Sequence, residues 1–331
     1  MLRWYDAHKR DLPWRRTTDP YAVLVSEVMC QQTRVDVVVP YFEAWMQKWP
    51  TMDDLAAADP EEVVAAWSGL GYYRRARNLH AAAKQVVADG WPTDLQELPG
   101  VGPYIAGAVA SIAFGRPVPA VDGNVQRVLA RMRDIRVDVT KAAGRKAINA
   151  LAIQLVDADR PGDWTQAVME LGATVCTPAS PDCVSCPVAM HCSAKAPEGL
   201  PVKATKRPPV DEDVHFALVR DSNKVLLVRR PERGLLGGTW GLPGGTATIP
   251  LEEHVSNQAG SSVRVMQENA TAEHVFSHRR WRMQVHHAEV IGGAVSGSAK
   301  WVLLDRLHTV GLSTAMRKAL DAALVLVPQA H

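Results

Sequence analysis

Apolar residues recur every three to four positions through much of residues 1–195, which is the spacing of amphipathic helices. Asp19-Pro20 is a typical helix start, because the Asp side chain caps free N–H groups and Pro suits the first turn. Gly69 and Gly71 are typical of a helix end. The pattern predicts helices over 20–34, 61–67, 76–88, 104–114, 125–132 and 145–157.

The hydrophobic pattern changes after residue 212 to short runs rich in Val and Leu, which are typical of β-strands. An Asp-Ser-Asn triplet between the first two runs predicts a hairpin. The pattern predicts strands over 214–220, 224–230, 282–292 and 300–305, and a closing helix over 312–326.

A proline-rich stretch over 196–212 separates the two patterns and is typical of a linker. The predicted fold class is therefore multidomain. We expect an all-α domain over 1–195, then a smaller α+β domain over 213–331. A chain of 331 residues exceeds the size at which a single hydrophobic core usually stops growing, which agrees with two domains.

Composition narrows the class of protein. With 47% hydrophobic and 22% charged residues, the chain resembles an ordinary globular protein, and a net charge of +2 does not indicate a general basic surface for nucleic acid. The sequence shows no membrane-spanning run or signal peptide, so we expect a cytoplasmic protein. Local basic patches are either DNA contacts or solvated surface: Arg74, Arg75, Arg77, Arg127, Arg131, Arg133, Lys203, Lys206 and Arg207.

Four of the five cysteines fall within residues 176–192, with the spacing C-x6-C-x2-C-x5-C. Such a cluster in a chain of this size predicts a metal site rather than a disulfide framework. Zinc sites of four cysteines usually contain two C-x-x-C pairs, whereas this loop has one. The spacing therefore favours an iron–sulfur cluster and leaves zinc open. The candidate ligands are Cys176, Cys183, Cys186 and Cys192.

Two carboxylates are candidates for catalysis. Glu27 shares a predicted helix face with Val23, Leu24 and Cys30, so burial should raise its pKa, as suits a general acid. The alternative is a buried Glu that pairs with an Arg. Asp122 precedes a predicted helix and is a candidate N-cap. Cleavage of an N-glycosidic bond requires such a pair, an acid with a raised pKa and an ionised Asp.

The segment LPGVGPY, residues 98–104, is a Gly-x-Gly turn that leads into a predicted helix. Free N–H groups at a helix start, beside glycines without Cβ atoms, can bind a phosphate. The alternative is a tight turn between two helices.

These motifs together resemble those of the helix-hairpin-helix DNA glycosylases, and among them the MutY-type adenine DNA glycosylases. The resemblance covers nearly the whole chain. Besides the four cysteines, it rests on LPWR (12–15), SEVMCQQT (26–33), GLGYYRRARNL (69–79), LPGVGPY (98–104), VDGNV (121–125), MELGATVC (169–176) and FSH (276–278).

The resemblance implies a helix-hairpin-helix glycosylase domain over 1–195 whose loop 176–192 holds a 4Fe–4S cluster as a support and not as the reaction centre. Glu27 would protonate the adenine, and Asp122, supported by Asn124, would stabilise the cationic sugar in a retaining-type mechanism. Tyr104 would lie near the flipped nucleotide.

The resemblance also implies DNA contacts outside the catalytic groups. Some residues would line the adenine pocket: Leu12, Trp14, Arg15 and Gln166. Others would insert into the base stack or hold a phosphate: Gln32, Tyr72, Gly100 and Gly102.

The nearest rival class is the endonuclease III type, which cleaves the DNA strand through a lysine Schiff base. That lysine would stand at position 104, where this chain has Tyr104, and a neutral phenol forms no imine. We therefore expect a monofunctional glycosylase that releases the base and leaves an abasic site.

The segment VLLVRRPERGLLGGTWGLPGG, residues 225–245, resembles a Nudix hydrolase. Glu252 and Glu253 follow, but the full array of metal-binding glutamates does not, so hydrolase activity is not expected. The resemblance implies instead a Nudix-like domain that recognises 8-oxoguanine through Phe276, Ser277 and His278. The alternative is an ordinary β-turn.

The sequence therefore predicts a bacterial, nucleoid-associated monomer that removes adenine opposite 8-oxoguanine or guanine in double-stranded DNA, away from any membrane. A protein that binds the mispair without turnover is the alternative. The presence of both Glu27 and Asp122 argues against it.

Overall fold

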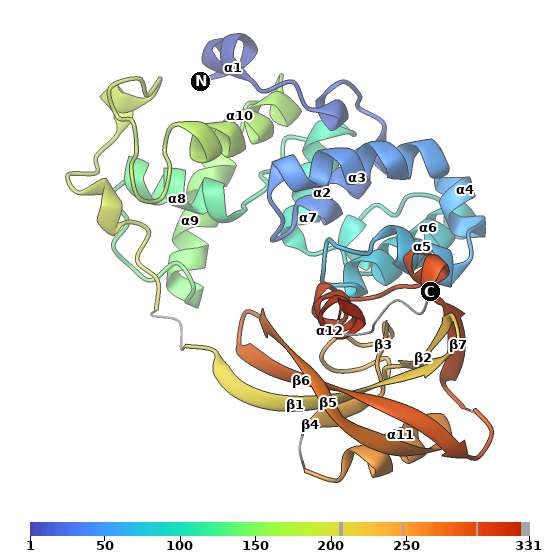
Figure 1. Cartoon of the computed structure of the whole chain (residues 1–331). Coiled ribbons are helices and arrows are strands. Elements are labelled where there is room, and N and C mark those ends of the chain that lie inside the picture. The colour runs from blue at the N-terminus through green and yellow to red at the C-terminus, as the bar shows by residue number, and fades with distance from the viewer. Residues whose placement is uncertain (205–207, 247, 296, 326–331) are drawn as a thin grey trace. The chain divides into compact units, whose positions relative to one another are not determined.

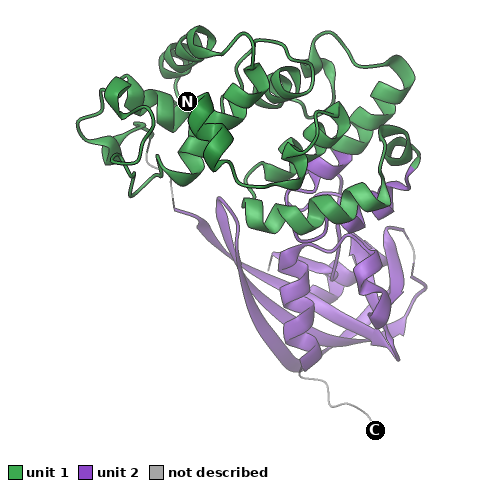
Figure 2. Ribbon diagram, turned by 90° about the horizontal axis from the view of Figure 1, so that it is seen from above, with its two compact units in different colours: residues 1–57, 78–205 green, residues 58–77, 206–331 purple. Residues whose placement is uncertain are grey.

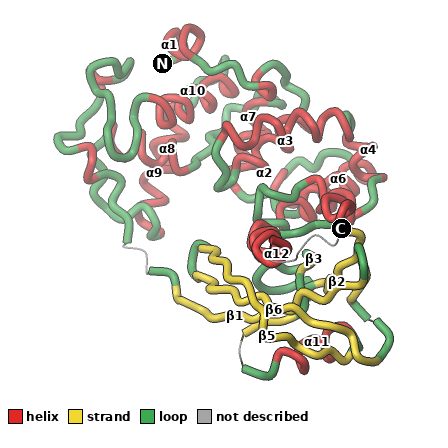
Figure 3. The backbone as a smooth tube through the Cα atoms, viewed as in Figure 1, coloured by secondary structure: helices red, strands yellow, loops and turns green. Residues whose placement is uncertain are grey.

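The computed structural model describes residues 1–204, 208–246, 248–295 and 297–325 (Figure 1). The chain forms two compact units, residues 1–57 with 78–205 and residues 58–77 with 206–331 (Figure 2). In the described residues, every strand lies beyond residue 209 (Figure 3), which confirms a helical part followed by a mixed α/β part. Segment 58–77, although inside the predicted helical domain, packs with the second unit.

The first unit is helical in its described residues. Its α-helices are α1 (Leu2–His8), α2 (Pro20–Cys30), α3 (Val35–Lys48), α4 (Met52–Ala57), most of α6 (Arg74–Asp89), α7 (Pro103–Ile112), α8 (Gly123–Met132), α9 (Ala142–Leu155) and α10 (Pro161–Thr174). Short 3₁₀ turns are η1 (Pro13–Arg15), η2 (Leu95–Glu97), η3 (Ala189–His191) and η4 (Pro197–Gly199).

Helix α2 shows how local sequence sets a boundary. The side chain of Asp19 accepts hydrogen bonds from the N–H groups of Tyr21 and Ala22, so the predicted cap is confirmed. The helix ends at Cys30 and not at residue 34, because Gln32 adopts a left-handed backbone with φ of 57°.

Helix α3 was not predicted, because its sequence contradicts helical propensity. It begins with a Val-rich run and contains Pro40, which removes one backbone hydrogen bond. Burial of Val38, Phe42 and Trp45 stabilises it instead.

The second unit contains helix α5 (Pro60–Ala66) and a seven-stranded sheet covered by α11 (Leu251–Ala259) and α12 (Thr314–Val325). The strands pair in the order β3-β2-β1-β6-β5, with β4 on β1 and β7 on β2, and only β1 and β6 run parallel. The strands are β1 (Val210–Asp221), β2 (Lys224–Arg229), β3 (Trp240–Gly241), β4 (Gly244–Thr246), β5 (Ser262–Val275), β6 (Arg279–Gly292) and β7 (Ala299–Leu303).

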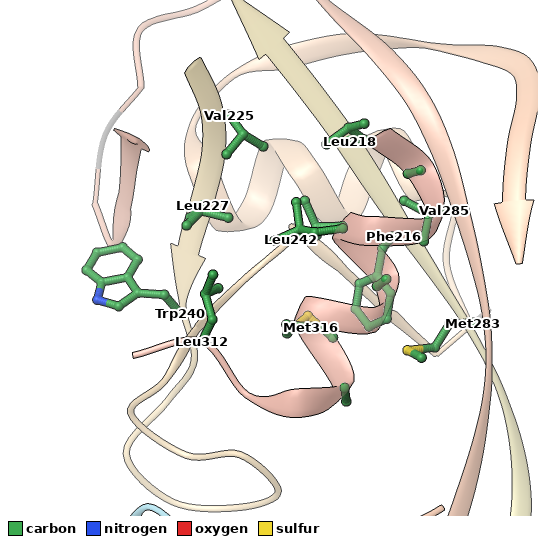
Figure 4. Close-up of a cluster of buried hydrophobic side chains, with 14 of the residues drawn as sticks. Phe216, Leu218, Val225, Leu227, Trp240, Leu242, Met283, Val285, Leu312 and Met316 are labelled. Atoms are coloured by element: carbon green, nitrogen blue, oxygen red, sulfur yellow. The ribbon is translucent and has the colours of Figure 1, made fainter. Parts of the chain in front are cut away.

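Each face of this sheet buries a hydrophobic cluster. Alternate residues of β1 point to opposite faces, so Phe216 and Leu218 pack with Met316 of α12 (Figure 4), whereas Ala217 and Val219 join the cluster beneath α11. The predicted hairpin between β1 and β2 is confirmed by the pairing of Arg220 with Val225.

Two boundaries beyond residue 195 differ from the predictions. Strand β1 begins at Val210, inside the predicted linker, because its N–H donates to the carbonyl of His278 at 3.1 Å. Strand β5 was not predicted, since its sequence lacks regular alternation and a bulge interrupts it between Val265 and Asn269. Lys206 and Arg207 lie outside the described residues. In the described part of the chain, no helix is long and apolar enough to cross a membrane.

Candidate active site

Glu27 lies near the end of α2, in a run of nine buried residues from Tyr21 to Met29. The helix is therefore enclosed on all sides and not on one face only. Glu27 is 9% exposed, and burial raises its pKa to about 7. A hydrogen bond from Tyr104 and the charge of Arg15 lower that pKa, while Asp122 raises it further. The predicted rise in the pKa of Glu27 on burial is confirmed.

Tyr104, in the first turn of α7, donates a short hydrogen bond from its hydroxyl to Oε2 of Glu27. Burial and the neighbouring carboxylates raise the pKa of Tyr104 well above its usual value, so its hydroxyl stays protonated at neutral pH. A neutral phenol in this place can donate to a carboxylate but cannot act as an amine nucleophile.

Asp122 caps α8 and also faces the site. Its Oδ1 accepts from the N–H of Val125 at 2.7 Å, and its Oδ2 accepts from the amide of Asn124 at 2.8 Å. Burial raises the pKa of Asp122, while both hydrogen bonds and the charge of Arg127 lower it. The cap and the candidate catalytic group are thus the same carboxylate, and the helix start favours its charged form.

Glu170 of α10 is a buried glutamate that the sequence analysis missed. It pairs with two arginines: Arg10 donates from Nε at 2.8 Å and Nη2 at 2.7 Å, and Arg15 donates from Nη2 at 2.8 Å. Burial opposes ionisation, but these donors lower the pKa of Glu170 to about 2. In the described part of the chain, Glu27 has no such arginine partner. The alternative considered for Glu27, a buried glutamate paired with an arginine, is therefore found at Glu170.

The predicted pocket residues lie on two segments of the first unit. Leu12 and Trp14 are buried in and before η1, where Trp14 packs edge-to-face on Phe42 with ring centroids 5.3 Å apart. Gln166 is half-buried on α10, one turn before Glu170 and therefore on the same helix face.

The Gly-x-Gly turn has the geometry of an open helix start. Gly100 has a φ of +77°, a left-handed conformation that favours glycine, and a Cβ there would meet Asn78 at 2.6 Å. Gly102 caps α7, and a Cβ placed on it would meet no atom within 4 Å. The space before the first turn of α7 is therefore open, as a phosphate-binding site at a helix N-terminus requires.

Gln32 and Tyr72 each adopt a positive φ, of 57° and 48°. Both side chains are exposed. Non-glycine residues in this region cost about 1–3 kcal/mol and cluster at functional sites. Asp134, Ser222 and Leu236 also have a positive φ, so the backbone alone does not single out Gln32 and Tyr72.

Arg127 and Arg131 are not surface contacts for DNA. Both are buried and donate to main-chain carbonyls: Arg127 to Cys176 at 2.8 Å and Gly172 at 2.7 Å, and Arg131 to Thr177 at 2.7 Å. Their spacing on α8 suggested a basic patch, but this face of the helix is buried. Arg133, on the same stretch, is exposed.

Arg127 links the cysteine loop to Asp122. Its Nη2 donates to Oδ1 of Asn124 at 2.8 Å, and the amide of Asn124 donates to Asp122. Close packing holds this arrangement, since a Cβ on Gly172 would meet the Cβ of Asn124 at 2.6 Å. A continuous chain of hydrogen bonds therefore runs from the carbonyl of Cys176 to the candidate catalytic carboxylate.

The four cysteines lie within electrostatic reach of one another. Burial, together with the charges of Cys176 and Cys192, raises the pKa of both Cys183 and Cys186. No three His, Cys, Asp or Glu side chains within the described ranges converge as a single ion would need. In a 4Fe–4S cluster each thiolate binds a different iron, so the sulfurs surround a volume. Four neighbouring cysteines fit that donor set, and one of them, Cys176, accepts at Sγ from Arg131 at 3.3 Å.

The FSH segment is the turn between β5 and β6. Phe276 packs on Trp281 with ring centroids 5.0 Å apart, and its N–H donates to the carbonyl of Arg279 at 2.7 Å. Ser277 and His278 are exposed at the tip, with Ser277 Oγ 3.3 Å from Nδ1 of His278. The hairpin therefore presents two exposed polar side chains that lie within hydrogen-bond distance of each other. Glu252 and Glu253 are exposed in the first turn of α11.

Comparison with known families divides the chain in the same order. A family described as "HhH-GPD superfamily base excision DNA repair protein" matches residues 25–152. A family described as "NUDIX domain" matches residues 214–322.

Curated relatives match almost the whole chain. It is 38% identical to the human adenine DNA glycosylase over 96% of its length and 72% of that protein. The adenine DNA glycosylase of Schizosaccharomyces pombe is 33% identical over 98% of this chain and 88% of that protein. That of Mycolicibacterium smegmatis is 43% identical over 62% of this chain and 73% of that protein.

A solved structure of a thermostable thymine-DNA glycosylase has a TM-score of 0.52 and 28% identity, over 58% of this chain and 91% of that chain. It supports the fold of the helical part.

Proposed function

The chain belongs to the adenine DNA glycosylases, within the helix-hairpin-helix superfamily of base excision repair, and we propose that it hydrolyses the N-glycosidic bond of adenine opposite 8-oxoguanine or guanine. The observation that supports this most strongly is the buried Glu27, with a pKa of about 7, beside Tyr104 and in the field of Asp122. We further propose that it acts on double-stranded DNA as a monomer.

Glu27 supplies the proton in this mechanism. With its pKa raised to about 7, Glu27 can still carry a proton near neutral pH, so it can donate to the leaving adenine and lower the barrier to departure. An exposed glutamate would be almost fully ionised at the same pH.

Asp122 stabilises the sugar. As the base leaves, positive charge develops on the deoxyribose, and a carboxylate held by Asn124 and Val125 is fixed in orientation before the reaction begins. A nearby carboxylate can also bond transiently to the sugar, as in retaining glycosidases. Tyr104 keeps Glu27 in place and offers no amine, so strand cleavage through an imine is not expected.

The target adenine must leave the duplex before these groups can reach it. Gln32 and Tyr72, each exposed and with a positive φ, would insert into the base stack. The open start of α7 at Gly102 would hold a phosphate of the same strand.

Adenine would be held by the segment around η1 and by α10. Leu12 and Trp14 supply an apolar wall, while Arg15 and Gln166 supply polar groups for the base edge. A mostly apolar pocket with a few fixed polar groups is the usual form of such a site.

Ser277 would read the lesion. 8-Oxoguanine differs from guanine by an N7–H donor and an O8 acceptor, and a hydroxyl can both accept and donate a hydrogen bond. The exposed hairpin tip offers that hydroxyl, while Phe276 anchors the turn.

Cys176, Cys183, Cys186 and Cys192 would hold a 4Fe–4S cluster. When bound, the cluster ties together the ends of loop 176–192 and so stabilises its shape. The chain's own contribution is the pair Arg127 and Arg131, which fix the carbonyl of Cys176 and connect the loop to Asn124.

Product analysis tests this function. A duplex with adenine opposite 8-oxoguanine should yield free adenine and an alkali-labile abasic strand, with no strand nicking and no adduct trapped by borohydride. Strong nicking with a trapped adduct, or no release of adenine, would contradict the proposal.

A further inference from the structure

Glu170 has every acceptor position engaged although it is fully buried. Besides three side-chain donors, the backbone N–H of Arg10 donates to its Oε1 at 2.9 Å. These bonds tie the segment before η1 to α10. A carboxylate with four donors is bound in one orientation and stays ionised.

Arg15 is the residue through which Glu170 reaches the catalytic acid. Its side chain is 9% exposed, donates to the carbonyl of Arg10 at 3.1 Å, and lies over the ring of Tyr5 with its Cζ 5.5 Å from the centroid. Its charge also acts on Glu27, where it favours the ionised form. Because η1 packs against α2, the Arg15 cation opposes the protonation that a general acid on α2 needs.

We propose that Glu170 is a positioning residue for the candidate acid Glu27, because it neutralises the Arg15 cation and holds it in one orientation at the base pocket. The proposal rests on the proposed role of Glu27 as general acid. It assigns to Glu170 an action through Arg15, with no contact to the substrate.

Three groups from packed elements act on Glu27 through a hydrogen bond or a charge. Tyr104 comes from α7, Asp122 from the start of α8 and Arg15 from η1. Of these, Tyr104 stays neutral and Asp122 disfavours ionisation of Glu27, so Arg15 is the cation among them. The net field at Glu27 therefore depends on how far Arg15 is compensated.

The test is the pH profile of single-turnover adenine release by Glu170→Gln in the full-length, cluster-loaded protein. Gln keeps the shape of the side chain and removes its charge. The uncompensated Arg15 should lower the pKa of Glu27, so the decline of the rate at high pH should move roughly 1 pH unit lower. Titration of the Glu27 carboxyl by ¹³C NMR should show the same shift without relying on turnover.

Two further variants separate positioning from folding. Glu170→Asp retains the charge, so its decline should stay at the wild-type pH even if the rate is lower. In an Arg15→Gln background, Glu170→Gln should leave the decline unmoved, because its effect passes through Arg15. The double variant removes both members of the buried Arg15–Glu170 ion pair. It therefore tests the action through Arg15 even if Glu170→Gln alone does not fold.

Asp11→Asn is the matched control. Asp11 pairs with Arg16 on the same segment, with Arg16 Nε donating at 2.9 Å, but both are exposed. Loss of that charge should move neither the profile nor the NMR titration.

A Glu170→Gln protein that is slower at every pH, with its decline at the wild-type pH, would overturn the inference and leave a purely structural role. A shift in the Arg15→Gln background would overturn it too. Failure of the wild-type protein to release adenine would instead contradict the proposed function.

Discussion

The hydroxyl of Tyr104 donates to Oε2 of Glu27, so a phenol is the direct hydrogen-bond partner of the candidate acid. Burial and this hydrogen bond act on Glu27 in opposite directions. Burial favours the neutral carboxyl, and the phenol stabilises the carboxylate, which leaves a pKa of about 7. The acid is thereby balanced near the pH at which proton donation is most effective.

Tyr104→Phe should move the pH dependence upward. Loss of the phenol removes a bond that stabilises ionised Glu27, so its pKa rises and the rate declines at a pH roughly 1 unit higher than in the wild type. Single-turnover rates across pH measure this. Tyr21→Phe, which removes a buried hydroxyl that donates to the carbonyl of Trp49, should leave the profile unchanged. A downward shift for Tyr104→Phe would contradict the account.

Arg127→Gln should loosen the connection between the cysteine loop and Asp122. The carbonyl of Gly172 loses this donor and that of Cys176 keeps only the longer bond from Arg131, which should cost about 3 kcal/mol of unfolding free energy. Denaturant unfolding measures that loss, and the time course of iron release under chelator should become faster. Arg133→Gln, on the exposed end of the same stretch, should change neither. Equal unfolding free energies and equal rates of iron release in the two variants would contradict a structural role for Arg127.

Cys183→Ser should abolish the iron–sulfur cluster. The wild-type protein is expected to be brown, with four irons per chain, because four neighbouring thiolates fit a 4Fe–4S cluster. The serine variant should lose the broad visible absorption and most of its iron. Cys30→Ser, which lies outside the loop, should keep both. A colourless wild-type protein that contains zinc would contradict this assignment.

Ser277→Ala should weaken the preference for 8-oxoguanine over guanine opposite adenine by roughly tenfold, the value of one hydrogen bond to the lesion edge. Excision from the G:A pair should stay near the wild-type rate. Competition between the two duplexes measures the ratio. Ser256→Ala, on the exposed side of α11, should leave it intact, and an unchanged ratio for both variants would mean that another group reads the lesion.

The parts of the fold that follow from local sequence could be predicted. Asp19-Pro20 sets the start of α2, and the Asp-Ser-Asn turn sets the β1–β2 hairpin, because caps and turns depend on a few adjacent residues. Helix α3 could not be predicted in this way. Its Val-rich start and Pro40 oppose a helix, and burial of distant partners decides its structure.

The candidate site shows the same limit. The raised pKa of Glu27 could be predicted, because its apolar neighbours lie within the same helix. Glu170 was missed because its partners Arg10 and Arg15 are about 155–160 residues away in sequence. A carboxylate among Ala167, Val168 and Leu171 in a predominantly apolar segment was the available signal. Arg127 illustrates the converse, since helical spacing alone does not tell a surface patch from a buried scaffold.

The most direct measurement is single-turnover release of adenine from an 8-oxoguanine:A duplex by the wild type and by Glu27→Gln at pH 7. An amide of the same shape cannot donate the proton, so the rate should fall by at least 10²-fold while duplex binding is retained. Glu97→Gln, an exposed carboxylate of the same unit, should match the wild type. Equal rates for wild type and Glu27→Gln would contradict the central claim.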